Sequence, residues 1–234
     1  MKITERQEKI LDTIIRDYIR LAQPISSELL EKKHDFEICP ATIRIEMQKL
    51  TDKGFLQQPH TSAGRVPTDK GYRFFVNRLL QGEKADLKSV PEFEEIFKKE
   101  KEDIFKFADH LVRTLAEASA SFSFLHILDE DFSWKDGWGE VLKQPEFGER
   151  NFIAEFNKLL EQFEENVDDL KLDSEMKVFI GSEIPFSRAQ GFSMMVQKCR
   201  LPKGEKGVLS LIGPKRMEYD RNISLMNSLI KLLE

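Results

Sequence analysis

One helical pattern, followed at once by a segment rich in proline and glycine, constrains this chain most. Within residues 40–53, Ile43, Met47 and Leu50 fall on one side of a helical wheel. Pro40 stands at the first helical position, where its missing N–H costs nothing, and Gly54 is suited to a left-handed stop. The sequence therefore predicts a helix with one buried face and one outward face.

A short β-hairpin is predicted directly after this helix. Residues 55–58 and 66–67 flank the segment 62–65, so Gly64 is expected to take the positive φ of a tight turn, with Arg65 near the tip. Pro59 and Pro67 exclude a central strand position, because proline cannot donate to a sheet. We therefore expect an exposed two-stranded wing.

Two further helices are predicted before this pair. Residues 4–7 fit a capping box, and an apolar stripe then recurs at helical spacing through Ile19. Pro24 ends this first helix, and Ser26 or Ser27 caps a short second helix that runs to Lys33. Three helices within about fifty residues, with a short connection before the third, form the helix-turn-helix arrangement.

The outward face of the third helix suits the major groove of DNA. Arg44 can pair with a guanine edge, Gln48 with adenine, and Ala41 or Ile45 can meet a thymine methyl group. The alternative is a solvated helix face with one stray isoleucine, which is common on protein surfaces. The hairpin favours the DNA interpretation, because Arg65 at a wing tip can enter a minor groove or grip phosphate.

The distribution of charge agrees with this interpretation although the whole chain carries a net charge of −5. Residues 1–82 hold 14 Lys and Arg against 11 Asp and Glu, whereas residues 83–234 hold 22 against 30. Phosphate contacts depend on local potential, so the N-terminal excess is the relevant quantity. The expected DNA-binding residues are Ser27, Ala41, Thr42, Arg44, Ile45, Gln48, Lys49, His60, Thr61, Ser62, Arg65, Lys70 and Arg73.

The rest of the chain predicts a second, α+β domain. A polar break at residues 81–86 is followed from Pro91 by a long charged helix, which we expect to link the domains. Strands are predicted at residues 122–127, 176–180, 192–198 and 207–212, and helices at residues 152–163 and 223–233. The expected domains are residues 1–82, a linker and long helix at 83–120, and residues 121–234.

No arrangement of residues predicts an enzyme, a cofactor or a metal site. The two cysteines lie far apart, the four histidines lack ligand spacing, and neither a Gly-x-Ser-x-Gly elbow nor a phosphate-binding loop is present. His126 is expected to be a core or edge histidine rather than a ligand, and Trp134 and Trp138 to anchor a loop or helix start, or else an interface. No apolar run approaches the roughly 18 residues of a membrane span, so a soluble cytoplasmic protein is expected.

Several stretches resemble one known family. Residues 41–47 (ATIRIEM) and 58–74 (QPHTSAGRVPTDKGYRF) resemble the winged-helix domain of the heat-inducible transcription repressors, the HrcA-type proteins. The resemblance resumes at residues 142–147 (LKQPEF), 179–185 (FIGSEIP) and 211–221 (LIGPKRMEYDR). It implies an α+β protein with an N-terminal winged helix-turn-helix domain and a C-terminal GAF-like domain. It also implies repression of chaperone genes at an inverted-repeat operator and a GroEL-type chaperonin as partner.

The chain departs from the family pattern at three places. Cys39 stands where the family usually has Ser or Thr before the proline of the recognition helix, and Ile45 stands where it usually has Asn. The family carries a long insertion that helps dimerisation, and the segment from His126 to Gln144 is too short to contain it.

Two functions of different classes follow. The first is a repressor that binds double-stranded DNA as a homodimer, because an inverted repeat calls for a two-fold protein. The second, motivated by Cys39 and Ile45, is a regulatory module that binds a ligand or a protein and whose winged helix is vestigial.

Overall fold

The computed structural model describes residues 3–61, 63–82, 91–128 and 132–233. The chain divides into two compact units, Met1–Gln81 and Gly82–Glu234. Each unit has its own buried core, and the two are described separately below.

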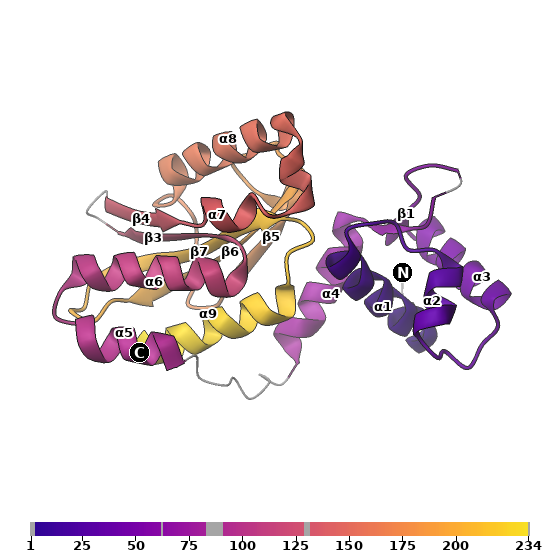
Figure 1. Cartoon of the computed structure of the whole chain (residues 1–234), viewed down its shortest axis with the longest axis horizontal. Helices are drawn as coiled ribbons and strands as arrows, with labels where there is room; N and C mark the ends of the chain where they lie inside the picture. Colours follow the sequence, from indigo (N-terminus) through magenta and orange to yellow (C-terminus); the bar gives the residue numbers. More distant parts are fainter. Residues whose placement is uncertain (1–2, 62, 83–90, 129–131, 234) are drawn as a thin grey trace. The chain divides into compact units, whose positions relative to one another are not determined.

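Within its described residues, the first unit consists of four helices and one hairpin. Its elements are α1 (Glu5–Leu21), α2 (Ser27–Lys33), α3 (Pro40–Asp52), β1 (Leu56–Gln57), β2 (Val66–Pro67) and α4 (Asp69–Gln81). Figure 1 shows its helices α1 to α4. The predicted capping box is confirmed, since the Thr4 hydroxyl accepts from the Gln7 backbone while the Gln7 side chain accepts from Thr4. Helix α1 is central, because it contacts α3, β2 and α4 through a buried stripe that includes Ile10, Ile14 and Ile15.

The hairpin differs from the prediction at Gly64 and Arg65. Strands β1 and β2 pair antiparallel, with Leu56 opposite Pro67, but Gly64 does not have a positive φ. Arg65 lies beside β2 rather than at a tip, where its N–H donates to the Ile25 carbonyl and its carbonyl accepts from the Ile25 N–H, at 2.8 and 2.9 Å. A Cβ on Gly64 would lie 2.4 Å from the Ile25 carbonyl. Glycine is therefore required here for close backbone approach and not for a turn.

The second unit is built on a five-stranded sheet in the order β4-β3-β7-β6-β5, in which every neighbouring pair is antiparallel. The strands are β3 (Phe122–Ile127), β4 (Phe132–Asp136), β5 (Lys177–Ile180), β6 (Phe192–Arg200) and β7 (Lys206–Pro214). The helices are α5 (Pro91–Glu100), α6 (Ile104–Ser119), α7 (Trp138–Val141), α8 (Arg150–Asn166) and α9 (Tyr219–Leu233), with short 3-10 turns η1 (Pro145–Gly148) and η2 (Gly181–Glu183).

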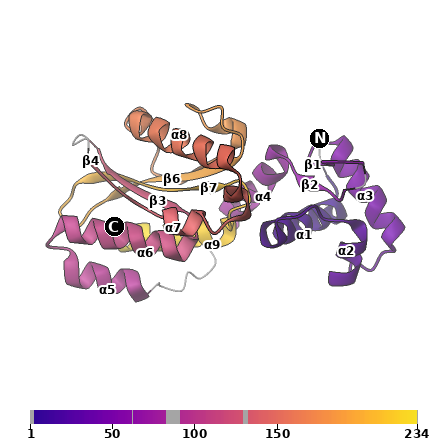
Figure 2. The same ribbon diagram turned by 45° about the horizontal axis from the view of Figure 1, so that its top comes forward.

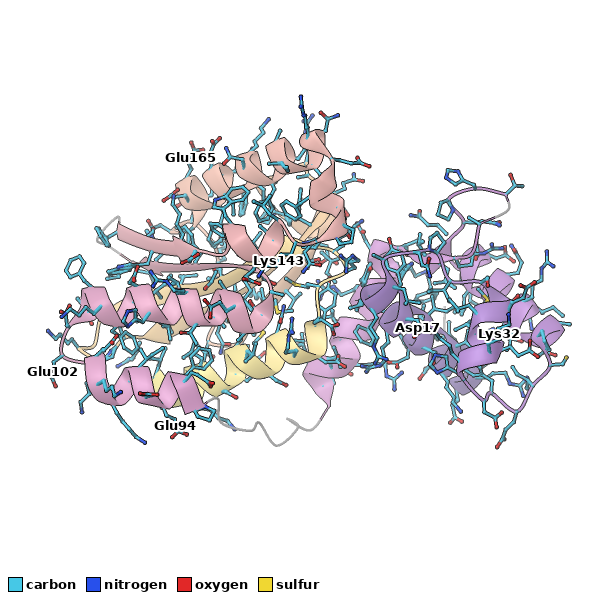
Figure 3. The ribbon with its side chains drawn as sticks, in the orientation of Figure 1. Asp17, Lys32, Glu94, Glu102, Lys143 and Glu165 are labelled. Atoms are coloured by element: carbon cyan, nitrogen blue, oxygen red, sulfur yellow. The ribbon has the colours of Figure 1, made fainter. Side chains whose placement is uncertain are left out.

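Helices cover both faces of this sheet. Figures 1 and 2 show α8 on one face and α6 with α9 on the other, while α5 packs against α6. Side chains fill the space between α8 and the sheet (Figure 3). Aromatic rings dominate there, including Phe124 against Phe163 at a centroid distance of 4.9 Å and Phe156 against Phe192 at 5.3 Å. The prediction of an α+β protein is confirmed.

Two predictions for this unit were wrong. The long helix from Pro91 is broken into α5 and α6, because Asp103 caps a new helix by accepting from the Lys106 N–H. Trp134 lies in strand β4 rather than in a loop, since β4 pairs with β3 along its whole length. Trp138 does begin a helix, α7.

Two of the stretches that carry the family resemblance meet in space. Arg216, just after β7, is buried and donates from Nε and Nη2 to the two carboxylate oxygens of Glu146 at 2.5 and 2.9 Å. Its Nη2 also lies 2.8 Å from Gln144 Oε1. This bidentate contact joins the turn before α8 to the end of β7.

Candidate nucleic-acid interface

The outward face of α3 is the centre of the candidate interface. Ile43, Met47 and Leu50 are buried in the first unit, as the helical pattern predicts. On the opposite side Ala41, Arg44 and Gln48 are exposed, and 55% of the Ile45 side chain remains accessible. Single exposed apolar residues are common on protein surfaces, so the exposure of Ile45 is compatible with a partner contact and does not by itself require one.

Arg65 fastens the hairpin to this helix. Its Nε donates to Thr51 Oγ1 at 3.1 Å, and its Nη2 donates to Gln48 Oε1 at 3.0 Å. The nitrogen of the Gln48 amide is also engaged, since Nε2 donates to Asp52 Oδ1 at 2.8 Å. We call Arg65, Gln48, Thr51 and Asp52 the Arg65 clasp. The clasp brings the predicted wing residue and a predicted base-reading residue together.

A second network runs behind α3 and engages Lys49. The Lys49 ammonium lies 2.8 Å from Glu46 Oε1, while Gln7 Nε2 donates to Glu46 Oε2 at 2.7 Å. These hydrogen bonds, from Lys49 first and then Gln7, hold the pKa of the buried Glu46 carboxyl below its ordinary value. Lys53 donates to Gln7 Oε1 at 2.9 Å and completes the network. Glu46 therefore offsets part of the Lys49 charge, although half of the Lys49 side chain remains exposed, and we expect Lys49 to be a weaker phosphate ligand than an unpaired lysine.

The thiol of Cys39 lies at the start of α3. In the described part of the chain, the Cys39 side chain forms no capping hydrogen bond to the helix backbone. Its Sγ lies 3.2 Å from Thr42 Oγ1. Hydrogen bonds from the Thr42 side chain and then the Thr42 backbone lower the pKa of this exposed thiol. Burial has the opposite effect on Cys199, where it raises the thiol pKa to about 12.

The other predicted contact residues lie on other elements of the first unit. Lys70 is exposed, and its Nζ donates to the Lys53 carbonyl at 2.6 Å and lies 4.4 Å from the centroid of the Phe55 ring. Arg73 is half-buried and donates to Asn77. His60 and Thr61 are exposed on the loop between β1 and β2, and Ser27 begins α2 two residues after the Ile25 bridge. Ser62 falls outside the described residues.

Sequence reasoning missed two members of the clasp. Asp52 is four residues after Gln48, and a Gln–Asp pair at this spacing is a recognised helix contact, so it was open to prediction. Thr51 carried no such signal, because its partner Arg65 is 14 residues away and reaches it only after the hairpin folds.

His126 in the second unit is a core histidine, as favoured above. Only 2% of it is exposed, with Nδ1 lying 2.9 Å from Ser133 Oγ and Nε2 lying 3.1 Å from Asp168 Oδ1. Among the residues that the structure describes, no group of three or more His, Cys, Asp or Glu side chains is arranged to hold a metal ion. Within the same residues, no helix is long and apolar enough to cross a membrane.

Comparison with known sequences decides the family. The family described as "HrcA protein C terminal domain" matches residues 69–223, which is more than half of the chain. The chain belongs to the HrcA family. The heat-inducible transcription repressor HrcA of Natranaerobius thermophilus is 52% identical over 99 residues, which cover 42% of this chain and 28% of that protein. The matched stretch thus covers less than a third of the length of this relative.

A second HrcA relative aligns along almost the whole chain. The heat-inducible transcription repressor HrcA of Thermodesulfovibrio yellowstonii is 27% identical over 342 alignment positions, which cover 99% of this chain and 97% of that protein. Because this chain has 234 residues, the relative carries a long stretch without a counterpart here. A crystal structure described only as a hypothetical protein shares the fold, with a TM-score of 0.81, 21% identity and coverage of 99% and 98% of the two chains.

Proposed function

We propose that this HrcA-family chain is a cytoplasmic transcription repressor that binds an inverted-repeat operator of heat-shock genes as a homodimer. The first unit acts as a winged helix-turn-helix DNA-binding domain, and the second, GAF-like unit carries assembly or regulation. The observation that supports this function best is the exposed face of α3, where Arg44, Ile45 and Gln48 stand together beside Arg65. The relatives are named heat-inducible transcription repressors, which supports a role as a repressor in the heat response.

The residues of this face have distinct roles in the proposal. Arg44 is exposed, and within the described residues it has no hydrogen-bond or ion-pair partner, so its guanidinium is available to pair with a guanine edge. Ile45 contacts a thymine methyl group. Gln48, oriented by the clasp, reads an adenine, while Arg65 keeps further N–H donors for phosphate or the minor groove beside α3. Lys70, Arg73, His60, Thr61, Ser62 and Ser27 contact the DNA backbone.

The family resemblance adds one partner. Under this proposal, a GroEL-type chaperonin maintains the active repressor. When unfolded proteins occupy the chaperonin, less active repressor remains and the operator is released. To measure this dependence, the chain is refolded with and without chaperonin, and its binding to the operator is then titrated. Equal recovery of binding in both samples would remove the chaperonin from the proposal.

The central experiment is a titration of the purified full chain against an inverted-repeat chaperone operator and a scrambled duplex, at two salt concentrations. We expect the wild type to bind the operator specifically. We expect Arg44→Ala to lose about 1–3 kcal/mol of binding free energy and to lose discrimination at one base position of each half-site. Arg78→Ala is the matched control, because Arg78 is an exposed arginine of α4 placed 4.0 Å from Glu8. Unchanged binding by both Arg44→Ala and Arg65→Ala would refute the assigned roles.

One observation favours the second candidate, a ligand-binding or protein-binding module with a vestigial DNA-binding unit. Lys49 is partly neutralised by Glu46, which lowers the positive potential of the α3 face. Under this function the same titration would show weak binding that does not distinguish operator from scrambled duplex. A thermal shift on adding a small ligand would accompany it.

A further inference from the structure

Asp52 belongs to the Arg65 clasp but has no assigned role toward DNA. It is the last residue of α3 and is exposed, and its Oδ1 accepts from Gln48 Nε2 at 2.8 Å. Its negative charge repels phosphate groups, so on charge alone Asp52 opposes the binding of DNA to this face. Its contact with Gln48 gives it a different use.

The hydrogen bonds of the clasp form a chain with one direction. The Thr51 hydroxyl donates to the Met47 carbonyl at 2.9 Å, so its oxygen is left to accept from Arg65 Nε at 3.1 Å. Arg65 Nη2 donates to Gln48 Oε1 at 3.0 Å, and Gln48 Nε2 in turn donates to Asp52. A guanidinium has no acceptor and a carboxylate has no donor, so neither partner of the Gln48 amide can reverse its role.

The Gln48 amide is therefore held in one of its two orientations. A half-turn of the amide would place Nε2 against the Arg65 guanidinium and Oε1 against the Asp52 carboxylate. Donor would then face donor, and acceptor would face acceptor. Arg65 cannot follow such a half-turn, because hydrogen bonds of 2.8 and 2.9 Å tie its backbone to Ile25.

The fixed amide still has hydrogen-bonding capacity for a base. An amide oxygen accepts two hydrogen bonds and an amide nitrogen donates two, and the clasp uses one of each. The acceptor and donor that remain to Gln48 stand in a fixed order. An adenine edge offers the complement, with a donor at N6 and an acceptor at N7, whereas a guanine edge offers two acceptors. A fixed order also separates an A·T pair from a T·A pair, where the same groups stand in the reverse order.

We propose that Asp52 is a positioning residue for DNA recognition, which holds the Gln48 amide in the orientation that selects adenine. Asp52 acts through Gln48 and makes no contact with the base. Without the carboxylate the amide occupies both orientations, so the match to adenine weakens and other bases gain a partner. This inference deepens the proposed function and rests on base recognition by α3.

The test is a competition titration of the full chain against operator duplexes in which each base pair of a half-site is replaced in turn. Gln48→Ala first identifies the base pair that Gln48 reads. Asp52→Asn keeps the size of the side chain but lets it donate as well as accept, so the amide is released. We expect the preference at the Gln48 base pair to fall by about twofold or more, since equal occupation of two orientations halves the competent population. The preference at the base pair that responds to Arg44→Ala should stay unchanged, as should thermal unfolding.

Glu31→Gln is the matched control, because Glu31 is an exposed acid of α2 outside the clasp. Both substitutions remove one negative charge from the first unit. Both should therefore raise the affinity for operator and scrambled duplex alike, which cancels in the ratio of affinities. Only Asp52→Asn should change the preference at the Gln48 base pair.

The outcomes separate the role of Asp52 from the proposed function. If the wild type binds the operator specifically and Asp52→Asn keeps its full base preference, the positioning role is overturned and the repressor stands. The same holds if Gln48→Ala changes the preference at no base pair, or if Asp52→Asn weakens the preference evenly at all of them. A wild type that binds every duplex alike overturns the proposed function, and the role of Asp52 with it.

Discussion

At the scale of single residues, the hydrogen bond between Arg65 and Gln48 makes the two side chains act as a unit. Gln48 Oε1 accepts from Arg65, which leaves the Gln48 amide oriented before any DNA arrives. Removal of either partner should therefore weaken operator binding through the same contact. In a double-mutant cycle of Arg65→Ala and Gln48→Ala, we expect a coupling energy of about 0.5–3 kcal/mol.

The control for this cycle pairs Gln48→Ala with Lys70→Ala. Lys70 donates to the Lys53 carbonyl and not to the clasp, so its effect should add to that of Gln48→Ala. Strictly additive losses for Arg65→Ala and Gln48→Ala would mean that the clasp opens when DNA binds.

The two thiols should differ strongly in reactivity. The nucleophile is the thiolate, so a lowered pKa lets Cys39 react at lower pH. The buried Cys199, whose pKa is raised to about 12, should stay inert in the folded chain. Stopped-flow labelling with an aromatic disulfide should show one fast equivalent, absent in Cys39→Ser. Thr42→Val removes the main cause of the lowered pKa, so the onset of the fast phase should move to higher pH. An unchanged onset would show that Thr42 does not activate the thiol.

At the scale of secondary-structure elements, the hairpin depends on one glycine. A Cβ at Gly64 meets the backbone of Ile25, which is buried and cannot move aside like a flexible side chain. We expect Gly64→Ala to lower the free energy of unfolding of the first unit by about 1–3 kcal/mol, as overpacking does. Urea unfolding measures it. Gly148→Ala, where a Cβ has open space, should be close to neutral, and a neutral Gly64→Ala would mean that the Ile25–Arg65 bridge is dispensable.

Helices and strands whose apolar residues recur at regular spacing were predictable from the sequence. Elements whose bounds depend on single polar residues were not. Helices α1 and α3, and the buried strands β3, β6 and β7, lie where the patterns indicated them. Strand β4 was missed because its exposed, partly polar residues carry little alternation. The break before α6 was missed because an apolar period continues across it. Only the N-cap residue Asp103 marks the start of the new helix.

The candidate interface shows the same division. Which α3 residues point outward follows from helical geometry, and Arg44, Ile45 and Gln48 are indeed exposed. The position of Arg65 does not follow, because it depends on a bridge to Ile25, forty residues earlier in the chain, and on a side-chain contact with Thr51. Such contacts appear only once separate elements pack together.

At the scale of the whole molecule, an acidic chain is proposed to bind a polyanion, so binding should depend on local charge and on salt. The logarithm of operator affinity should fall linearly with the logarithm of salt concentration, by about 0.9 for each phosphate neutralised. Lys70→Ala should reduce this slope by about one unit per protomer. Lys49→Ala should change it less, because Glu46 already offsets part of the Lys49 charge. Equal slopes for all three proteins would place neither lysine at the DNA backbone.

The clasp and the bridge from Arg65 to Ile25 have a consequence for control. Together they tie α2, α3 and the hairpin into one body through both backbone and side chain. Such a body meets its target already ordered and loses little conformational entropy on contact. A signal can therefore change the conformation of this body only slightly. If the chain is the dimeric repressor proposed above, we expect stress to act on how two such bodies are spaced and aligned, and to leave each one intact.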